Sequence, residues 1–434
     1  NIMSLFNFIT ELLQLKDPNI EFSEDIHEIR KKDILYKLVC ARLSYTPECC
    51  PVCGVVNEAA SIIKHGTKSS DIKLLPCNGN PTILRLHKQR FLCRECGHTF
   101  SAKTDIVEKN CFISRQVKLK ILFDLKLKMS EKDIAFSTFV SHSTVSRAID
   151  RNYQMLIPDS RHLPRHLMFD EFRSASDANG SMSFMYADCD THEIIDIVED
   201  RRLQSLRKYF LRYDSSVRRQ VETICIDMYA PYMSLIREMF PNAEIVIDRF
   251  HIVQLLSRAL NKTRVNTMKN YRKRSKEYKR LKKYWKLILK DEQDLDGKEF
   301  KAYTHFRHWV CMKTVVSRSI SCDHELKATY DAYQTLLYDI KTKNSRHLIK
   351  HLKELQNSNI SNDMQTAVST ILQYSSYVEN ALKYEYSNGT IEGLNNYIKV
   401  IKRIAFGYRS FFHFRNRILI SRGLIKPIEK YRAA

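Results

Sequence analysis

The 434-residue sequence predicts a multidomain α+β protein whose parts differ clearly in composition. Two Cys-x-x-Cys-Gly motifs lie between residues 50 and 97, which favours a small metal-stabilised β domain. From residue 166 to residue 248, short apolar runs alternate with helical patterns, as is typical of an α/β core. From about residue 261 to residue 385 the pattern is almost entirely helical.

The composition favours a polyanionic partner. The chain carries 71 Lys+Arg against 49 Asp+Glu, a formal charge of +22, so nucleic acid is the first candidate. No apolar run approaches the ~18 to 20 residues that span a bilayer, and the first residues lack the features of a signal peptide. The twelve cysteines are unevenly placed and suit metal binding in a reducing cytoplasm. We expect a cytoplasmic protein with neither a membrane partner nor a small-molecule substrate.

Residues 1–45 are expected to form a helical segment. Leu5, Ile9, Leu12 and Leu13 recur at helical spacing and would form one apolar face. No function can be assigned to this segment from its residues.

Residues 46–112 are predicted to form a zinc-binding ribbon domain. Two knuckles, CPVCG and CRECGH, offer four thiolates, and strands are expected between them at 72–75 and 82–92. Four thiolates complete a tetrahedral zinc site without an open position, so this Zn²⁺ would be structural. The predicted ligands are Cys50, Cys53, Cys93 and Cys96, while the alternative ligands are Cys49, His65, Cys77 and His98.

Residues 113–157 are predicted to form a helix-turn-helix domain. A first helix spans 115–128, Ser130 caps a second through residue 136, and Ser141 caps a third over 143–151. If the third helix enters a major groove, its foremost residues are Ser143, Thr144 and Arg147. A three-helix module with only a structural role is the alternative interpretation.

The α/β pattern follows a short linker. Strands are predicted at 166–173, 181–189 and 193–199, then a helix at 203–213, a strand ending at Asp227 and a strand at 244–248. Asp170 lies in the first strand, and its neighbour Glu171 must point to the opposite face. Asp227 lies where a strand gives way to a loop, a usual position for a site in an open sheet.

A third carboxylate, Glu392, lies near the start of a helix predicted from residue 390. Ile391, Leu394, Ile398 and Ile401 would form its buried stripe. Asp170, Asp227 and Glu392 together would offer oxygen ligands suited to Mg²⁺ or Mn²⁺. Asp248, with His251 one turn later, is the alternative to Asp227, and Glu392 could instead simply favour a helix N-terminus.

Basic residues are concentrated in two places. Residues 262–290 contain thirteen Lys+Arg and one acid, with aromatic residues interleaved, which favours contact with DNA phosphates over a merely solvated helix. The helix that carries Glu392 is also basic along one face. The residues expected to contact DNA in these two segments are Arg272, Lys273, Arg274, Asn396, Lys399 and Arg403.

The motifs MFDEF, ICIDMYAPY, IVIDRFH and NGTIEGLNNYIKVIKR resemble, in this order, those of bacterial insertion-sequence DDE transposases of the ISL-three family. The resemblance extends from about Cys50 to Arg422. It implies a ribonuclease-H-like catalytic core over 165–260 and 386–434, interrupted by a large all-helical insertion over 261–385. It also favours Asp227 over Asp248, and the cysteines at 50, 53, 93 and 96 as the zinc ligands.

The resemblance implies a DNA transposase. Such an enzyme would bind the terminal inverted repeats of an insertion sequence, and two Mg²⁺ or Mn²⁺ ions held by the acidic triad would support cleavage and strand transfer. Its partners would be double-stranded transposon ends and target DNA, and cutting two ends together implies a homodimer associated with the bacterial nucleoid. The alternative is a catalytically inactive, transposase-derived DNA-binding regulator. A structure-selective nuclease is a weaker alternative.

Overall fold

The computed structural model describes residues 5–31, 33–151, 157–386 and 389–422. The chain divides into two compact units. The first contains Asn1–Ile157, Ala175–Asp177 and Ile398–Ala434, and the second contains Pro158–Ser174 and Ala178–Tyr397. The first unit is therefore assembled from both ends of the sequence.

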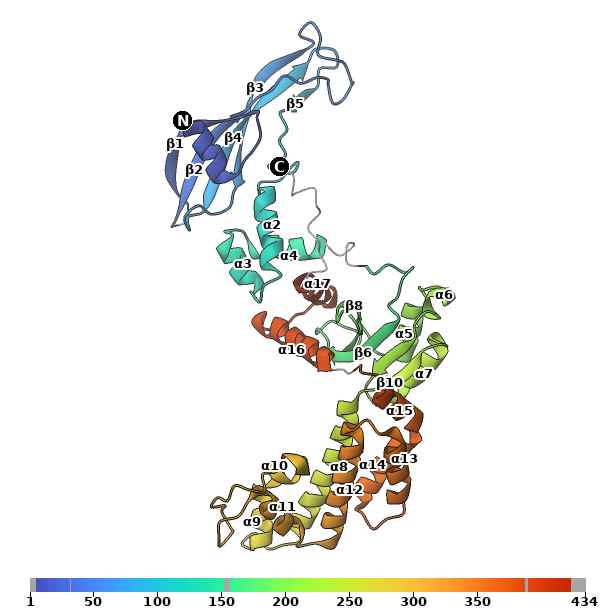
Figure 1. The fold of residues 1–434 in the computed structure, drawn as a ribbon. Helices are drawn as coiled ribbons and strands as arrows, with labels where there is room; N and C mark the ends of the chain where they lie inside the picture. The colour runs from blue at the N-terminus through green and yellow to red at the C-terminus, as the bar shows by residue number, and fades with distance from the viewer. Residues whose placement is uncertain (1–4, 32, 152–156, 387–388, 423–434) are drawn as a thin grey trace. The chain divides into compact units, whose positions relative to one another are not determined.

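A twisted sheet forms the N-terminal part of the first unit (Figure 1). Among the described residues its strand order is β1-β2-β4-β3, with β5 paired to β4. β2 and β4 run parallel, whereas the other neighbours are antiparallel. The elements are α1 (Leu5–Leu13), β1 (Ile20–Lys31), β2 (Ile34–Leu43), β3 (Ile62–Lys73), β4 (Thr82–Cys93) and β5 (Thr99–Ser101).

The prediction that residues 1–45 form a helical segment is wrong beyond α1. β1 and β2 form an antiparallel hairpin that pairs Ile20 with Leu43 and Lys31 with Ile34. The physical reason is an alternating pattern: Ile20 and Phe22 are buried while Glu21 between them is exposed. This two-residue period directs one face of the strand into the core and is incompatible with a helix.

Four helices of the first unit lie together: α2 (Arg115–Asp124), α3 (Glu131–Ser137), α4 (His142–Arg151) and α17 (Phe411–Ser421). The first three correspond to the helices predicted here, although α2 ends earlier than expected. Ser130 begins α3 with a capping box, because its hydroxyl accepts from the Asp133 N–H while the Asp133 carboxylate accepts from the Ser130 N–H. The capping signal read from the sequence is thus confirmed.

Polar contacts join α17 to the other three helices. His413 bridges Glu131 of α3, at 2.9 Å, and Asp150 of α4, at 2.7 Å. Arg417 is fully buried and donates to the carbonyl oxygens of Leu125, Leu127 and Met129 just after α2. Because the Arg417 side chain is fully buried, these three carbonyl oxygens provide the acceptors that its guanidinium needs.

The second unit contains a mixed sheet with the strand order β10-β9-β6-β7-β8. β6, β7 and β8 are successive antiparallel neighbours, and β9 and β10 are added in parallel on the other side of β6. The carboxyl ends of all five strands lie within one or two residues of the ends predicted from the sequence. They are β6 (His166–Arg173), β7 (Met182–Asp188), β8 (Ile194–Val198), β9 (Thr223–Ile226) and β10 (Glu244–Ile247).

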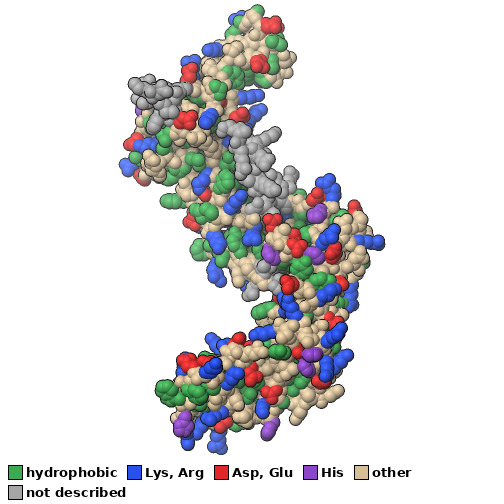
Figure 2. Space-filling view, viewed as in Figure 1, with side chains coloured by type: hydrophobic (Ala, Val, Ile, Leu, Met, Phe, Trp, Pro, Cys, Tyr) green, Lys and Arg blue, Asp and Glu red, His purple; other side chains and the backbone are tan. Residues whose placement is uncertain are grey.

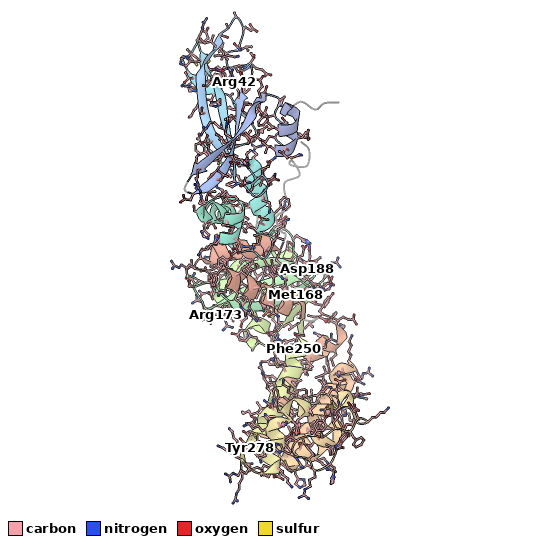
Figure 3. The ribbon with its side chains drawn as sticks, turned by 90° about the vertical axis from the view of Figure 1, so that its left-hand side faces the viewer. Arg42, Met168, Arg173, Asp188, Phe250 and Tyr278 are labelled. Atoms are coloured by element: carbon pink, nitrogen blue, oxygen red, sulfur yellow. The ribbon has the colours of Figure 1, made fainter. Side chains whose placement is uncertain are left out.

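The helices α5 (Leu203–Phe210), α6 (Ser215–Arg218) and α7 (Ala230–Met239) follow the first strands. Phe169 of β6 contacts Phe210 of α5 and Phe240 just after α7, with ring centroids 5.6 and 6.1 Å apart. α5 and α7 therefore cover the face of the sheet to which Phe169 points. Side chains at alternate positions, such as Met168 (labelled in Figure 3) and Asp170, belong to the other face.

Helices dominate the second unit after β10. α8 begins at Arg249, next to Phe250 in Figure 3, and packs against α12 and α14, while α15 packs on β10. A single isolated bridge, Lys301 to Val310, interrupts the helical pattern among the described residues. The helices are α8 (Arg249–Lys269), α9 (Lys276–Lys283), α10 (Trp285–Ile288), α11 (Met312–Ile320), α12 (His324–Lys341), α13 (Ser345–Leu355), α14 (Asn362–Gln373) and α15 (Ser375–Lys383). The last helix, α16 (Gly389–Ile404), contains the boundary between the two units, since the second unit ends at Tyr397 and the first resumes at Ile398.

Replacing Arg417 with Met should destabilise the first unit by about 3 kcal/mol, because three carbonyl oxygens lose the donor that joins α17 to the end of α2. Hydrogen exchange of the α2 to α4 amides measures this loss. Arg409→Met, at an exposed position near the start of α17, is the matched control and should leave exchange unchanged. Equal exchange in the two variants would show that the Arg417 contacts do not stabilise these helices.

Candidate functional site

The four cysteines of the two knuckles converge in the first unit. The Sγ atoms of Cys50 and Cys96 are 3.7 Å apart, as are those of Cys53 and Cys93, and all four lie within 4.8 Å of one another. A tetrahedron with Zn–S bonds of ~2.3 Å has S···S edges of ~3.8 Å, so this spacing fits one zinc ion. The alternative ligands Cys49, His65, Cys77 and His98 lie outside this cluster.

Backbone N–H groups favour the thiolate form at Cys50, whereas the pKa values of the Cys53 and Cys96 thiols are raised. The backbone N–H of Cys53 is the largest of the influences that lower the pKa of the Cys50 thiol to about 6, which favours the thiolate that zinc requires. Gly54 and Gly97, the glycines that close the knuckles, have φ of +75° and +69°. Residues with a side chain rarely adopt this conformation, which explains the Gly after each Cys-x-x-Cys.

Two aspartates lie side by side in the second unit because of strand register. β6 and β9 are parallel neighbours that pair Leu167 with Ile224 and Met168 with Cys225. Continued by two residues, this register brings Asp170 opposite Asp227, and both side chains then fall on the same face of the sheet. Both aspartates line one pocket.

Asp170 is held by two donors. One carboxylate oxygen accepts from the Glu171 N–H at 2.6 Å, and the other accepts from Asn395 Nδ2, also at 2.6 Å. Burial is the main cause that raises the pKa of Asp170 to about 7, and the nearby charge of Asp227 adds to it. The nearby His251 lowers the pKa of Asp170, but this effect is smaller than that of burial.

Asp227 lies next to a histidine. His251 Nε2 is 2.8 Å from Asp227 Oδ1, and this hydrogen bond is the main cause that raises the pKa of His251 above its ordinary value. Asp248 is buried and caps α8 by accepting from the Phe250 N–H at 3.2 Å. Asp227, Asp248 and His251 could together hold a metal, since one ligand atom of each lies within 4.8 Å of the others. A nitrogen ligand is less suited to Mg²⁺ than a carboxylate, and Asp248 does not line the pocket shared by Asp170 and Asp227.

Glu171 serves a different purpose from Asp170, as the strand alternation predicts. Its carboxylate accepts two hydrogen bonds from Arg201, at 2.5 and 2.6 Å, and a third from the Tyr232 hydroxyl at 3.1 Å. The negative charge of Glu171 is therefore compensated by Arg201 on the side of the sheet that α7 covers.

The third predicted carboxylate, Glu392, lies in α16, but its side chain is outside the described residues. Three residues of the stripe predicted for this helix, Leu394, Ile398 and Ile401, are buried, and the side chain of the fourth, Ile391, is outside the described residues. Asn395 follows Glu392 by three residues, close to one helical turn, and this is the residue that contacts Asp170.

Sequence reasoning missed Asn395 and selected its neighbour Asn396, which is exposed. The spacing of three from Glu392 was the available signal. The amide oxygen of Asn395 is buried and has no hydrogen-bond partner among the described residues. A buried oxygen without a donor, next to two aspartates, fits a site completed by a hard divalent cation and its water ligands.

The residues predicted to contact DNA differ in their surroundings. Ser143 and Arg147 of α4 are exposed, whereas Thr144 is half-buried, with its hydroxyl 2.9 Å from that of Ser141. Side chains at the other predicted positions are exposed on α16 and before α9: Arg272, Lys273, Arg274, Asn396, Lys399 and Arg403. Figure 2 shows Lys and Arg side chains distributed over the surface of the helices.

The aromatic residues interleaved with the basic run do not share one role. Tyr284 is buried among apolar side chains and donates to the Thr304 carbonyl at 2.6 Å. Tyr271 donates to the Cys322 carbonyl at 2.6 Å. These two rings stabilise the helical part of the second unit, which differs from the expectation that the aromatics of this run contact DNA. Trp285 is 41% exposed and remains accessible.

Comparison with known protein families shows to which family the chain is related. Residues 167–418, more than half of the chain, match an ISL3 family described as "Transposase". The chain belongs to the ISL3 family of transposases. Residues 46–96 separately match the "zinc-finger of transposase IS204/IS1001/IS1096/IS1165", which includes all four clustered cysteines. The predicted relationship to this family, with its N-terminal zinc ribbon, is therefore confirmed.

Two curated relatives share parts of this ISL3 chain. The "Transposase for insertion sequence element IS1001" of Bordetella parapertussis is 23% identical over 226 residues, which cover 51% of this chain and 52% of that protein. An "ATP-dependent protease" of Lactococcus lactis subsp. lactis is 38% identical over 111 residues, 25% of this chain and 34% of that protein. The chain thus spans about half or less of each relative. It contains no Gly-Lys followed by Ser or Thr, the end of the ATPase phosphate loop.

Among the described residues of this ISL3 transposase, no helix is both long and apolar enough to cross a membrane.

Replacing Cys53 with Ser should reduce bound zinc from one ion per chain to nearly none and destabilise the sheet of the first unit, because the tetrahedral thiolate set loses one ligand. The zinc content of each variant is measured as the zinc that is released when its thiols are chemically modified. Cys49→Ser is the matched control, since Cys49 is exposed and adjacent to Cys50 but outside the cluster. Zinc retained by the Cys53 variant but lost by the Cys49 variant would reassign the ligands.

Replacing Asp170 with Asn should stabilise the metal-free protein at pH 8 by roughly 1 to 3 kcal/mol and have little effect at pH 4. The folded pKa of about 7 lies above the ordinary value of 3.8 for an aspartate, so ionisation of Asp170 lowers stability as the pH rises between these values. Thermal unfolding at the two pH values, with and without Mg²⁺, measures the effect, and Mg²⁺ should narrow the difference at pH 8. Asp331→Asn, exposed on α12, is the control. If the difference in stability between the native protein and the variant did not change with pH, burial of the charged carboxylate would not be its cause.

Proposed function

We propose that this protein is a DDE transposase that binds the terminal inverted repeats of an insertion sequence and catalyses metal-dependent DNA cleavage and strand transfer. The observation that carries the proposal is the register of β6 and β9, which aligns Asp170 with Asp227 on one face of the sheet. The contact between Asn395 and Asp170 supports the third member of the triad, because it brings α16 to this face one turn beyond Glu392.

The topology of the second unit is consistent with a ribonuclease-H-like core. Three antiparallel strands are followed by two parallel strands added on the other side of β6, in the order expected for such a core. On this interpretation, helices α9 to α14 constitute most of the insertion proposed over 261–385, and α16 returns the chain to the core. The boundaries proposed for the other domains are 1–45, 46–112, 113–157, 165–260 and 386–434.

In this proposal Asp170, Asp227 and Glu392 hold two Mg²⁺ or Mn²⁺ ions. When bound, these ions would supply an activated water or 3′-hydroxyl and neutralise the charge that develops on the phosphate. Asn395 donates to Asp170 and fixes the direction of its free lone pairs, while His251 does the same for Asp227. The raised pKa of Asp170 means that its carboxylate gives up a proton when a cation binds.

DNA recognition would be divided between two kinds of contact. The zinc ribbon and the helix-turn-helix would read the inverted repeats, with Ser143, Thr144 and Arg147 foremost on α4. The formal charge of +22 would supply sequence-independent attraction to phosphates. The phosphate contacts proposed are Arg272, Lys273, Arg274, Asn396, Lys399 and Arg403. Pairing two transposon ends and joining them to target DNA would require at least a homodimer, acting at the nucleoid.

Glu392→Gln should abolish metal-dependent release of 3′ ends from a labelled duplex that carries the element's end sequence, while DNA binding survives. The amide keeps the shape of the side chain but loses its charge, so a fall in cleavage of at least about 100-fold is expected. Gel analysis of cleavage in Mg²⁺ and in Mn²⁺ measures it. Glu379→Gln, exposed on α15, is the matched control.

Strand transfer to a second duplex by the native protein would separate transposition from hydrolysis alone. Binding without cleavage by the native protein, with both metals and with paired ends, would instead establish the regulator that lacks catalytic activity.

A further inference from the structure

A pocket of about 490 Å³ opens beside the aligned aspartates. Asp170, Asp227 and His251 form one end of it. The remainder, here called the side pocket, has no part in the proposed metal chemistry. Its lining includes Tyr229, Gln254, Leu255, Arg258, Gln373 and Tyr374, from a face of α8, the beginning of α7 and the end of α14. The paired side chains of Glu171, Arg201 and Tyr232 also line the pocket.

The side pocket combines flat apolar walls with hydrogen-bonding groups. Tyr229 and Tyr374 provide aromatic rings and Leu255 an aliphatic surface, while Gln254 and Gln373 provide amides. Arg258 is exposed on α8, seven residues or about two helical turns beyond His251, so the two side chains lie on the same face of the helix. Rings for stacking, amides for base edges and a guanidinium for phosphate are the groups that bind a nucleotide.

The aromatic wall is held in place before any ligand arrives. The rings of Tyr229 and Tyr232 meet edge to face with centroids 5.0 Å apart. Arg201 lies 5.8 Å from the Tyr229 ring and is itself fixed by Glu171. Tyr374, at the end of α14, stacks with Tyr377, and their ring centroids are 6.3 Å apart. Rings supported in this way lose little freedom when a ligand stacks on them.

Size decides which nucleic acid fits. The volume falls within the range of roughly 300 to 1,000 Å³ that holds small ligands, which suits one nucleotide. A DNA duplex is too wide to enter the pocket, because the whole duplex is wider than its major groove, which already measures ~12 Å across. A base that enters the pocket must therefore leave its stack, at a cost of a few kcal/mol that aromatic stacking of ~1 to 3 kcal/mol partly offsets.

We propose that the side pocket takes one unpaired nucleotide of the DNA end, adjacent to the cleaved phosphodiester, with its base against Tyr229 and Tyr374 and its phosphate at Arg258. The inference rests on the proposed function, because the acidic pair defines where the cleaved bond lies. It assigns these residues to distortion of the DNA end and leaves metal binding to the acidic side chains. Substrate that is already unpaired at this position avoids the unstacking cost.

The test measures binding without divalent metal, so that cleavage plays no part. Duplexes carrying the element's end are labelled with a fluorophore, and a single mismatch is placed in turn at each position close to the cut. Fluorescence anisotropy should show that the native protein binds one mismatched duplex about 10-fold more tightly than the paired duplex, since the mismatch removes part of the unpairing cost. Tyr374→Ala should lose this preference.

Matched variants separate stacking from general damage. Tyr374→Phe keeps the ring and should keep the preference, and Tyr338→Ala, which removes an exposed ring of α12 outside the pocket, should also keep it. Binding of the paired duplex with no preference for any mismatch would overturn the side pocket while leaving the transposase proposal intact. A preference that survives Tyr374→Ala would also overturn it. Failure to bind any of the duplexes would count against the proposed function itself.

Discussion

The parallel register between β6 and β9 is the constraint on which the candidate site depends. A shift of one residue would turn either Asp170 or Asp227 to the opposite face of the sheet. The apolar strands on both sides prevent this shift, because Leu167, Ile224 and Cys225 would lose their buried positions. Ordinary core packing therefore specifies the alignment of two carboxylates that repel one another.

The neighbours of these carboxylates limit the cost of bringing them together. Asn395 and the Glu171 N–H donate to Asp170, and His251 donates to Asp227. Glu171, which lines the same pocket, accepts hydrogen bonds from Arg201 and Tyr232, and its charge is partly compensated there. Without a bound cation the negative charges of the two aspartates are not fully compensated, as the raised pKa of Asp170 indicates. The site is organised by the protein but not neutralised by it.

Local patterns predicted much of this structure. Short apolar runs that end in Asp located the strands of the second unit, and capping residues located α3. Cysteine spacing located the cluster around Cys50, whose convergence the structure shows. These features depend on residues close in sequence, where periodicity and turn chemistry are informative.

The missed features depend on contacts between distant residues. The β1–β2 hairpin was overlooked because a helical pattern at residues 5–13 was extended too far, and because the second partner of β2 is β4, which lies about forty residues later in the sequence. Asn395 was passed over because the sequence could not show which of two adjacent amides would meet Asp170. The burial of Tyr284 likewise results from residues around Tyr303 that come some twenty positions later.

The attachment of α17 to α2, α3 and α4 has a consequence for synthesis of the chain. Translation proceeds at about 5 to 20 residues per second, so α17 leaves the ribosome roughly 10 to 50 seconds after α4. Throughout that interval Glu131 and the carbonyls after α2 lack His413 and Arg417. The N-terminal helices reach their final form only after the complete second unit has been made, so an unfinished chain carries an unfinished first unit.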